Sequence, residues 1–145
     1  MAVRSVQVCS AEATNESMKK HKVHFLGGEG INWALDHDIQ HLTRLSGAFV
    51  EPVSIEKAEI IHSVYWGAVL EVPQKHLNRC LVIASIADKP QIVFSRPEYL
   101  KVRDKIDVWL CEYHESLNFV SNNGLRCMLF PDPIDLRQFH APDDR

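Results

Sequence analysis

The chain lacks any long hydrophobic run and any block of basic residues. Its longest apolar stretch, Cys80 to Ala87, is interrupted only by Ser85 and is far shorter than the roughly 20 residues that a membrane-spanning helix needs. The formal net charge is −3 over 145 residues, which does not favour nucleic acid as a partner. Residues 1–20 contain no apolar core, so we expect neither a signal peptide nor a transmembrane segment.

Cysteine is scarce, with four residues and no CxxC pair. Cys80, Cys111 and Cys127 fall inside apolar, strand-like runs, where a free thiol behaves as a small core residue. We therefore predict reduced cysteines, no disulfide framework and a cytoplasmic location.

Two nucleotide-binding signatures are also absent. Gly28-x-Gly30 is followed by Trp33, where the dinucleotide fingerprint needs a third glycine for close packing of helix on strand. There is no G-x-x-x-x-G-K-S/T sequence either. An NAD-dependent oxidoreductase and a P-loop protein are therefore disfavoured. The segment Gly27-Gly28-Glu29-Gly30 that is present has two readings: a tight turn that needs positive φ, or a loop whose free amides accept an anion.

Six short apolar runs predict strands, at residues 22–26, 48–53, 58–66, 80–87, 107–113 and 125–130. Pro52 makes the second of these the weakest. Helices are expected at residues 33–45, 97–105 and 114–122, the last ending in Asn123–Gly124. The alternation predicts an α/β, Rossmann-like, doubly wound and mostly parallel sheet of about six strands, with helices on both faces.

The domain boundaries follow from composition and from this pattern of elements. Residues 1–21 are polar and small and are predicted to form a flexible N-terminal tail. Residues 22–139 carry the predicted sheet, in a chain whose length suits one domain. Residues 140–145 are predicted to begin a linker or a tail.

Ligands of open α/β sheets bind beyond the carboxyl ends of the strands. In this chain that position holds the glycine segment, His62 and Glu112, although loops are polar in any protein. Glu112 and Glu115 flank His114, an arrangement that can tune an imidazole. His37 and His41 have the spacing to share a metal. No third ligand is suggested for them, so we predict no metal.

Four segments, taken in order, resemble the N-terminal domain of GT-B fold glycosyltransferases of the GT4-like, or group 1, retaining family. The similarity runs from about Lys22 to Phe139, and the last segment is the most specific because in that family it marks the crossover between domains. The four segments are KVHFLGGEG, AEIIHSVYW, IDVWLCEYHESLNFVSNNGL and LFPDPIDLRQF.

The resemblance implies transfer of a sugar from a nucleotide sugar to a sugar or lipid-linked acceptor, with no cofactor and no required metal. It implies that Gly27, Gly28 and Gly30 approach the donor diphosphate. It also implies that Glu29, His62 and Glu112 lie on the acceptor side. The nucleotide is held mainly by a C-terminal domain that would follow Arg145, so the isolated chain is expected to be inactive.

The chain departs from the family pattern in two places. Val64 stands where many members have the second histidine of His-x-His, and Tyr113 stands where many have serine. No catalytic residue is therefore assigned. The alternative is a stand-alone, non-catalytic α/β module that binds a small molecule or forms a homodimer. In that case we expect an exposed apolar surface formed by Tyr65, Trp66 and Phe139.

Overall fold

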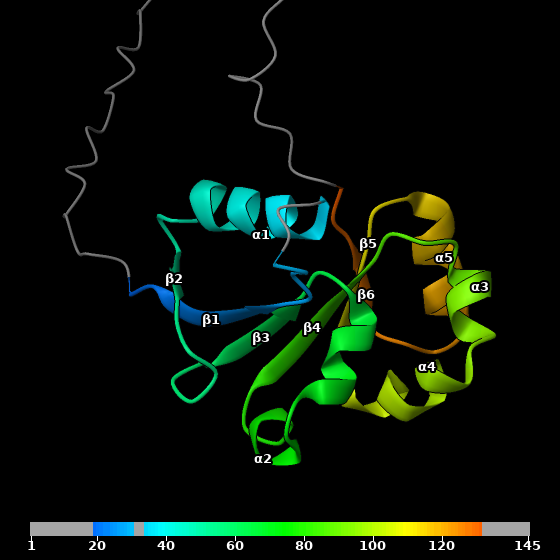
Figure 1. Ribbon diagram of the computed structural model, residues 1–145. Coiled ribbons are helices and arrows are strands. Elements are labelled where there is room, and N and C mark those ends of the chain that lie inside the picture. Colours follow the sequence, from blue (N-terminus) through cyan, green and yellow to red (C-terminus); the bar gives the residue numbers. More distant parts are fainter. Residues whose placement is uncertain (1–18, 31–33, 132–145) are drawn as a thin grey trace, which may run out of the picture.

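The computed structural model describes residues 19–30 and 34–131, which form one six-stranded sheet with the strand order β2-β1-β3-β4-β5-β6 (Figure 1). Every neighbouring pair of strands is parallel. The chain turns back after β2 and passes over β1 to β3, so the topological switch point lies between β1 and β3. The strands are β1 (His21–Leu26), β2 (Val50–Pro52), β3 (Ile60–Ser63), β4 (Leu81–Ile86), β5 (Val108–Cys111) and β6 (Cys127–Leu129).

Helices lie on both faces of the sheet, as the sequence predicts, but they are divided unequally (Figure 1). One face carries α1 (Ala34–Leu45), the crossover between β1 and β2. The opposite face carries η1 (Trp66–Glu71), α3 (Pro90–Phe94), α4 (Pro97–Val102) and α5 (His114–Asn122). Two short pieces, α2 (Gln74–Leu77) and the 3₁₀ turn η2 (Arg103–Lys105), connect the elements of this second layer.

The face that η1, α3, α4 and α5 cover holds the core. Along β4 every second side chain is fully buried there, namely Val82, Ala84 and Ile86. This alternation is what a strand with two different faces requires. Burying a side chain of the size of Val82 or Ile86 stabilises the fold by about 1.5–3 kcal/mol. An aromatic cluster completes this core, with ring centroids 4.1–6.0 Å apart, formed by Phe94, Tyr99, Trp109 and Phe119.

Trp66 belongs to this core and is only 3% exposed, so the prediction that it lies on an apolar surface is wrong. The predicted strand 58–66 ends at Ser63, and Trp66 begins the 3₁₀ helix η1. The turn before η1 directs the indole inward. Tyr65, one residue earlier, is 39% exposed as expected, whereas Phe139 lies outside the described residues.

The face that α1 covers is much less complete. Phe25, His62 and Ile83 are neighbours across β1, β3 and β4 on this side. No residue of α1 is buried, and Met128 of β6 is 52% exposed. The two faces of the sheet are therefore packed to different degrees.

The ends of several elements follow local chemistry. Gly124 has φ +74°, its N–H donates to Ser121 O, and the N–H of Leu125 donates to Val120 O. These two bonds form the Schellman end that Asn123–Gly124 predicts for α5. Proline is the first residue of both α3 and α4, where its missing N–H has no cost.

Pro52 lies in the edge strand β2, the position where a strand tolerates a residue without an N–H. The cysteines of the described region, Cys80, Cys111 and Cys127, are free, as predicted. Burial, together with the neighbouring Cys127, raises the pKa of Cys111 to about 12. Within residues 19–30 and 34–131, no helix has the length and apolar character needed to cross a bilayer.

Candidate functional site

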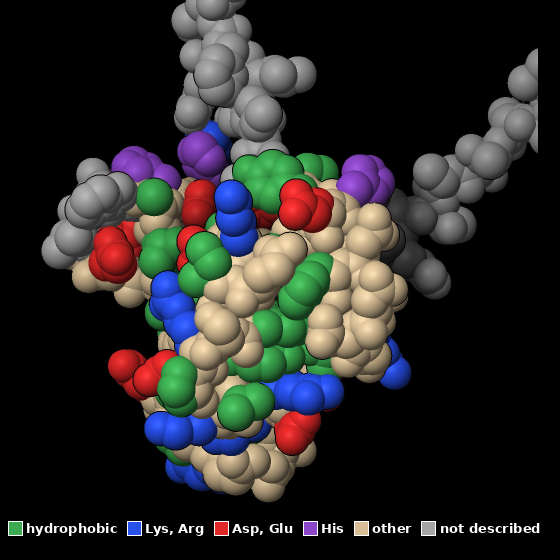
Figure 2. Space-filling model, turned by 90° about the vertical axis from the view of Figure 1, so that its right-hand side faces the viewer, with side chains coloured by type: hydrophobic (Ala, Val, Ile, Leu, Met, Phe, Trp, Pro, Cys, Tyr) green, Lys and Arg blue, Asp and Glu red, His purple; other side chains and the backbone are tan. Residues whose placement is uncertain are grey.

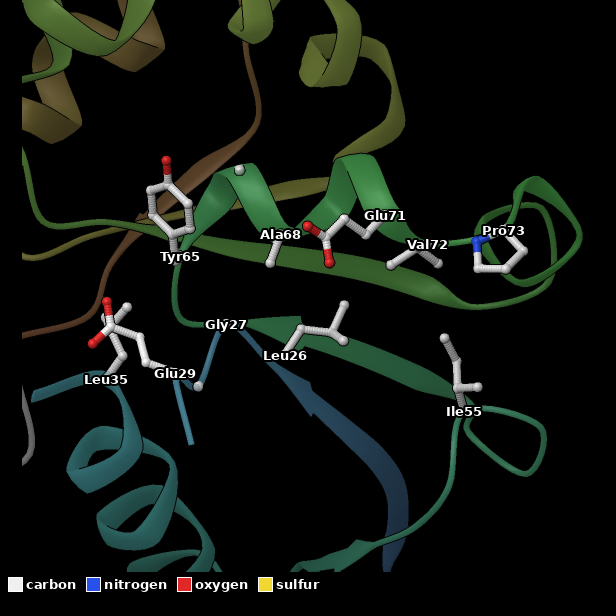
Figure 3. A pocket seen from close by; sticks show the side chains of 12 residues that line it. Leu26, Gly27, Glu29, Leu35, Ile55, Tyr65, Ala68, Glu71, Val72 and Pro73 are labelled. Carbon is white, nitrogen blue, oxygen red and sulfur yellow. The ribbon is translucent and has the colours of Figure 1, made fainter. Parts of the chain in front are cut away.

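A groove of about 540 Å³ opens at the β1/β3 switch point (Figure 3). One wall is η1, which contributes Ala68 and Glu71, with Val72 directly after it, and Leu26 of β1 lies opposite (Figure 3). Gly27, Glu29, Leu35 and Tyr65 lie at one end of the groove, and Ile55 and Pro73 lie at the other (Figure 3). Gly28 lines the groove as well. The switch point is where open α/β sheets bind ligands, so this groove is the leading candidate site.

Gly27 has a conformation and surroundings that exclude any side chain. Its φ is +97°, and a Cβ atom built on it would lie 2.8 Å from the backbone nitrogen of Tyr65. The glycine therefore lets the end of β1 approach the turn between β3 and η1. This close approach closes one end of the groove.

The glycine loop already binds a carboxylate of the protein itself. The N–H of Gly30 donates to Oδ1 of Asp36 at 3.0 Å, and a Cβ atom on Gly28 would lie 2.7 Å from the same oxygen. Asp36 lies in the first turn of α1, where the helix dipole favours a negative charge. Asp36 therefore occupies one of the positions at which an anion would meet the loop.

The groove combines an apolar floor with negative charge. Leu26, Ile55 and Val72 supply apolar surface, and Glu29 and Glu71 supply carboxylates. Among the described residues that line it, none is lysine, arginine or histidine. This chemistry suits a neutral ligand with several hydroxyl groups better than an anionic one.

His62 lies on the α1 side of β3, away from the groove. It is 9% exposed, and its ring lies near Phe25, at 5.6 Å between centroids, and Phe130, at 6.4 Å. Burial lowers the pKa of His62 to about 4. Its hydrogen-bond contact is long, 3.4 Å from Nε2 to Ser85 Oγ. These features describe a neutral imidazole in an apolar setting.

Glu112 follows β5 and lines a small cavity of about 40 Å³ together with Ser85, Asp38 and Phe130. Ser85 and Phe130 also contact His62, so the structure brings Glu112 and His62 into one neighbourhood on the α1 side. It brings Gly27, Gly28 and Glu29 together in the groove, which shares Leu35 of α1 with this small cavity. Gly30 contacts Asp36 but does not line the groove.

The remaining histidine candidates do not form a site with other ligands. His37 is exposed and His41 is half-buried on α1, and no group of three metal-ligating side chains occurs in residues 19–30 and 34–131. His114 and Glu115 are both exposed at the start of α5.

Glu71 and Tyr65 line the groove without having been predicted as site residues from the sequence. Tyr65 directly precedes η1, and Glu71 is its last residue. The apolar residues of Trp66–Glu71 show no helical periodicity, so the sequence does not distinguish this segment from the strand before it. The sequence did carry one signal, because the polar groups of Tyr65 and Glu71 stand at the two ends of this apolar segment. Comparisons of the chain with family models, with curated proteins and with solved structures find no match.

Proposed function

We propose that this chain is the acceptor-side domain of a nucleotide-sugar-dependent glycosyltransferase, and that its groove binds a polyhydroxylated acceptor. The observation that carries the proposal is the pair of carboxylates, Glu29 and Glu71, above an apolar floor at the switch point. Carboxylate oxygens accept hydrogen bonds from sugar hydroxyls, and the floor suits the C–H face of a sugar ring. The order of the four segments that resemble the GT4-like family supports the same assignment.

The donor role of the glycine loop is a separate part of the proposal. Gly27 and Gly28 line one end of the groove, where they would approach the diphosphate of a nucleotide sugar. Asp36 would oppose that diphosphate, because its carboxylate already accepts the N–H of Gly30. The donor therefore relies on a second domain for most of its binding. The free cysteines of the described region support a cytoplasmic setting for this activity.

Titration of the full chain with neutral sugars, followed by NMR, tests the acceptor role. We expect methyl glucoside or a related probe to shift the amide signals of Gly27, Gly28 and Ala68. Glu71→Gln should weaken this binding about tenfold or more, which corresponds to about 1.5 kcal/mol for one hydrogen bond to a charged group. Glu98→Gln, at an exposed position on α4, is the matched control and should change nothing.

A groove that binds no neutral sugar would contradict the acceptor role, and so would equal weakening of sugar binding by Glu71→Gln and by its control Glu98→Gln. A second measurement concerns transfer. The chain alone should release no sugar to an acceptor from uridine or guanosine nucleotide sugars, because one domain cannot close around the reaction and exclude water. Product above the protein-free background would refute this part.

The alternative function is a dimerisation module, and the incomplete α1 side of the sheet favours it. An apolar cavity of about 280 Å³ opens there between Phe25, His62, Leu110 and Phe130, and the half-exposed Met128 lines it as well. Exposed apolar surface of this kind promotes self-association. Sedimentation equilibrium should then find a dimer that Met128→Lys dissociates and that Leu100→Lys, at a 67% exposed position on α4, leaves intact. A monomer at all concentrations would exclude this function.

A further inference from the structure

Three large aromatic side chains of residues 19–30 and 34–131 are exposed, namely Phe49, Tyr65 and Tyr113. Figure 2 shows the molecule from the side toward which the strands run, where hydrophobic side chains are exposed among charged ones. Of the three aromatic residues, only Tyr65 lines the groove at the β1/β3 switch point, and it is 39% exposed there. A ligand in the groove would therefore meet the ring of Tyr65.

The backbone of Tyr65 is held from two directions. Ser63 Oγ and the N–H of Ala68 both donate to its carbonyl oxygen, at 2.6 Å and 3.0 Å. From the other direction Gly27 approaches so closely that a Cβ atom on it would lie 2.8 Å from the nitrogen of Tyr65 and 3.1 Å from its Cβ. The direction in which the side chain leaves the backbone is therefore fixed.

Gly67 allows the ring of Tyr65 to lie against η1. A Cβ atom on Gly67 would lie 2.6–2.8 Å from Cε1, Cζ and Oη of Tyr65, so the hydroxyl end of the ring packs on the backbone of Gly67. Gly67 is not one of the glycines with positive φ, so space and not conformation excludes a side chain there. The ring also packs against Trp66, with 5.6 Å between centroids. Tyr65 is thus ordered by the protein and still exposed in the groove.

An ordered aromatic ring suits a particular kind of ligand. Ordering a mobile side chain on binding costs free energy, and the packing on Gly67 already limits the motion of this ring. The face of an aromatic ring carries partial negative charge, so it attracts the C–H groups on one face of a pyranose. Glu29 and Glu71 line the same groove, where their carboxylates can accept hydrogen bonds from the hydroxyl groups at the edge of the sugar.

We propose that Tyr65 selects cyclic sugars by stacking on the C–H face of a pyranose ring, and that Gly67 positions Tyr65 for this contact. The assignment rests on the acceptor role proposed for the groove, and it narrows the acceptor from any polyhydroxylated molecule to a pyranoside. An open-chain polyol offers the carboxylates similar hydroxyl groups but has no ring face. The groove should therefore distinguish the two classes of ligand through Tyr65.

NMR titration of the full chain with methyl glucoside and with sorbitol tests the role of Tyr65. We expect methyl glucoside to bind about fivefold more tightly than sorbitol or better, as one aromatic stacking contact allows. Tyr65→Ala should abolish this preference by weakening the binding of the glucoside alone, whereas Tyr65→Phe keeps the ring and should keep the preference. Tyr113→Ala, at a 61% exposed position outside the groove, is the matched control and should change neither affinity.

Gly67→Ala tests how the ring is positioned. The added methyl group should displace the hydroxyl end of the Tyr65 ring, which can swing outward, so urea unfolding should match that of the wild type. Binding of methyl glucoside should fall about as far as it does in Tyr65→Ala. The double variant should lose no more than either single variant, because both changes remove the same contact. Gly47→Ala, at a glycine outside the groove that also lacks positive φ, is the control.

The outcomes separate this assignment from the acceptor role. Equal affinities of the wild type for methyl glucoside and sorbitol would overturn the selection by Tyr65 and leave the acceptor role in place. Failure of both to bind would overturn the acceptor role and this assignment with it. Additive losses from Tyr65→Ala and Gly67→Ala would show that Gly67 does not act through Tyr65.

Discussion

At the scale of single residues, two glycines of the loop after β1 have the same kind of backbone but different surroundings. Gly27 and Gly30 both have positive φ, +97° and +70°. A Cβ atom on Gly27 would collide with the backbone of Tyr65, whereas one on Gly30 would meet no atom within 4 Å. The first glycine is required by both conformation and space, and the second by conformation alone.

This difference predicts unequal effects of alanine at the two positions. Gly30→Ala should destabilise the fold by roughly 1–2 kcal/mol, the cost of left-handed backbone in a residue with a Cβ. Gly27→Ala should cost about 3 kcal/mol or more, because overpacking adds about 1–3 kcal/mol. Urea unfolding of both variants measures this difference. Equal losses would show that the approach of Gly27 to Tyr65 does not constrain the loop.

At this scale the sequence predicts backbone conformation well and side-chain contacts poorly. The glycine turn and the Gly124 helix end follow from residue type, because few residues other than glycine adopt positive φ readily. The pairing of Asp36 with Gly30 does not follow from residue type, because it depends on the path of the chain between the loop and α1. The burial of Trp66 was missed for a similar reason, since β3 ends at Ser63, three residues before the predicted end, and the turn into η1 then sets the direction of the indole.

At the scale of elements, α1 differs from the other long helix of the described chain. It has no buried residue, whereas α5 buries Ser116 and Val120. Local opening is easiest where few apolar contacts hold an element. The two helices therefore should differ in local stability although both are amphipathic.

Hydrogen exchange should detect this difference. We expect the amides of α1 to exchange at least about 100-fold faster than those of β4, whose Val82, Ala84 and Ile86 are fully buried. The amides in the second half of α5 serve as the helical control and should be protected more strongly than those of α1. Equal protection of α1 and β4 would mean that α1 is held by contacts beyond those described.

The order and type of the long elements were predictable, because the strands of a parallel sheet appear in the sequence as nearly continuous apolar runs and its long helices as periodic apolar positions. The short elements η1, α2 and α3 were not predicted. Each has four to six residues, too few for a periodic pattern, and tertiary packing decides their conformation. The groove was missed with them, since one of its walls is η1.

At the scale of the whole molecule, the buried His62 makes stability depend on pH. Its pKa in the folded chain is about 4, below the ordinary value near 6.5. Between these values the unfolded chain binds a proton that the folded chain excludes, so stability falls as the pH is lowered. The contribution of His62 is complete above pH 6.5 and is lost by about pH 4.

The expected loss is up to about 3 kcal/mol, from about 1.4 kcal/mol for each pKa unit. Urea unfolding at a series of pH values measures it. His62→Gln has no imidazole to protonate, so the difference between the two pH curves isolates this residue from the other histidines. Parallel curves between pH 4 and 6.5 would contradict a depressed pKa for His62.

The sequence placed His62 and the glycine loop at one rim of the sheet. In the fold the glycine loop does lie at this rim, where it contacts Asp36 of α1 and Tyr65, whereas His62 lies within β3 on the α1 face. Successive side chains along a strand point to opposite faces of the sheet, so the last residues of β1 and β3 alternate between the two faces. Strand order alone predicts the edge of the sheet at which a site lies. It does not predict on which face of the sheet a given side chain lies.

The unequal packing of the two faces also has a spectroscopic consequence. Trp66 and Trp109 are both buried on the α3–α5 side, and in the described chain neither indole N–H has a hydrogen-bond partner. An indole in such a dry setting fluoresces at short wavelength and shifts to the red when water reaches it. The fluorescence of Trp66 and Trp109 therefore reports unfolding of the core on the α3–α5 side of the sheet. Changes around His62, on the α1 side, leave it unchanged. The fluorescence of these two tryptophans can thus distinguish protonation or ligand binding on the α1 side of the sheet from unfolding of the core.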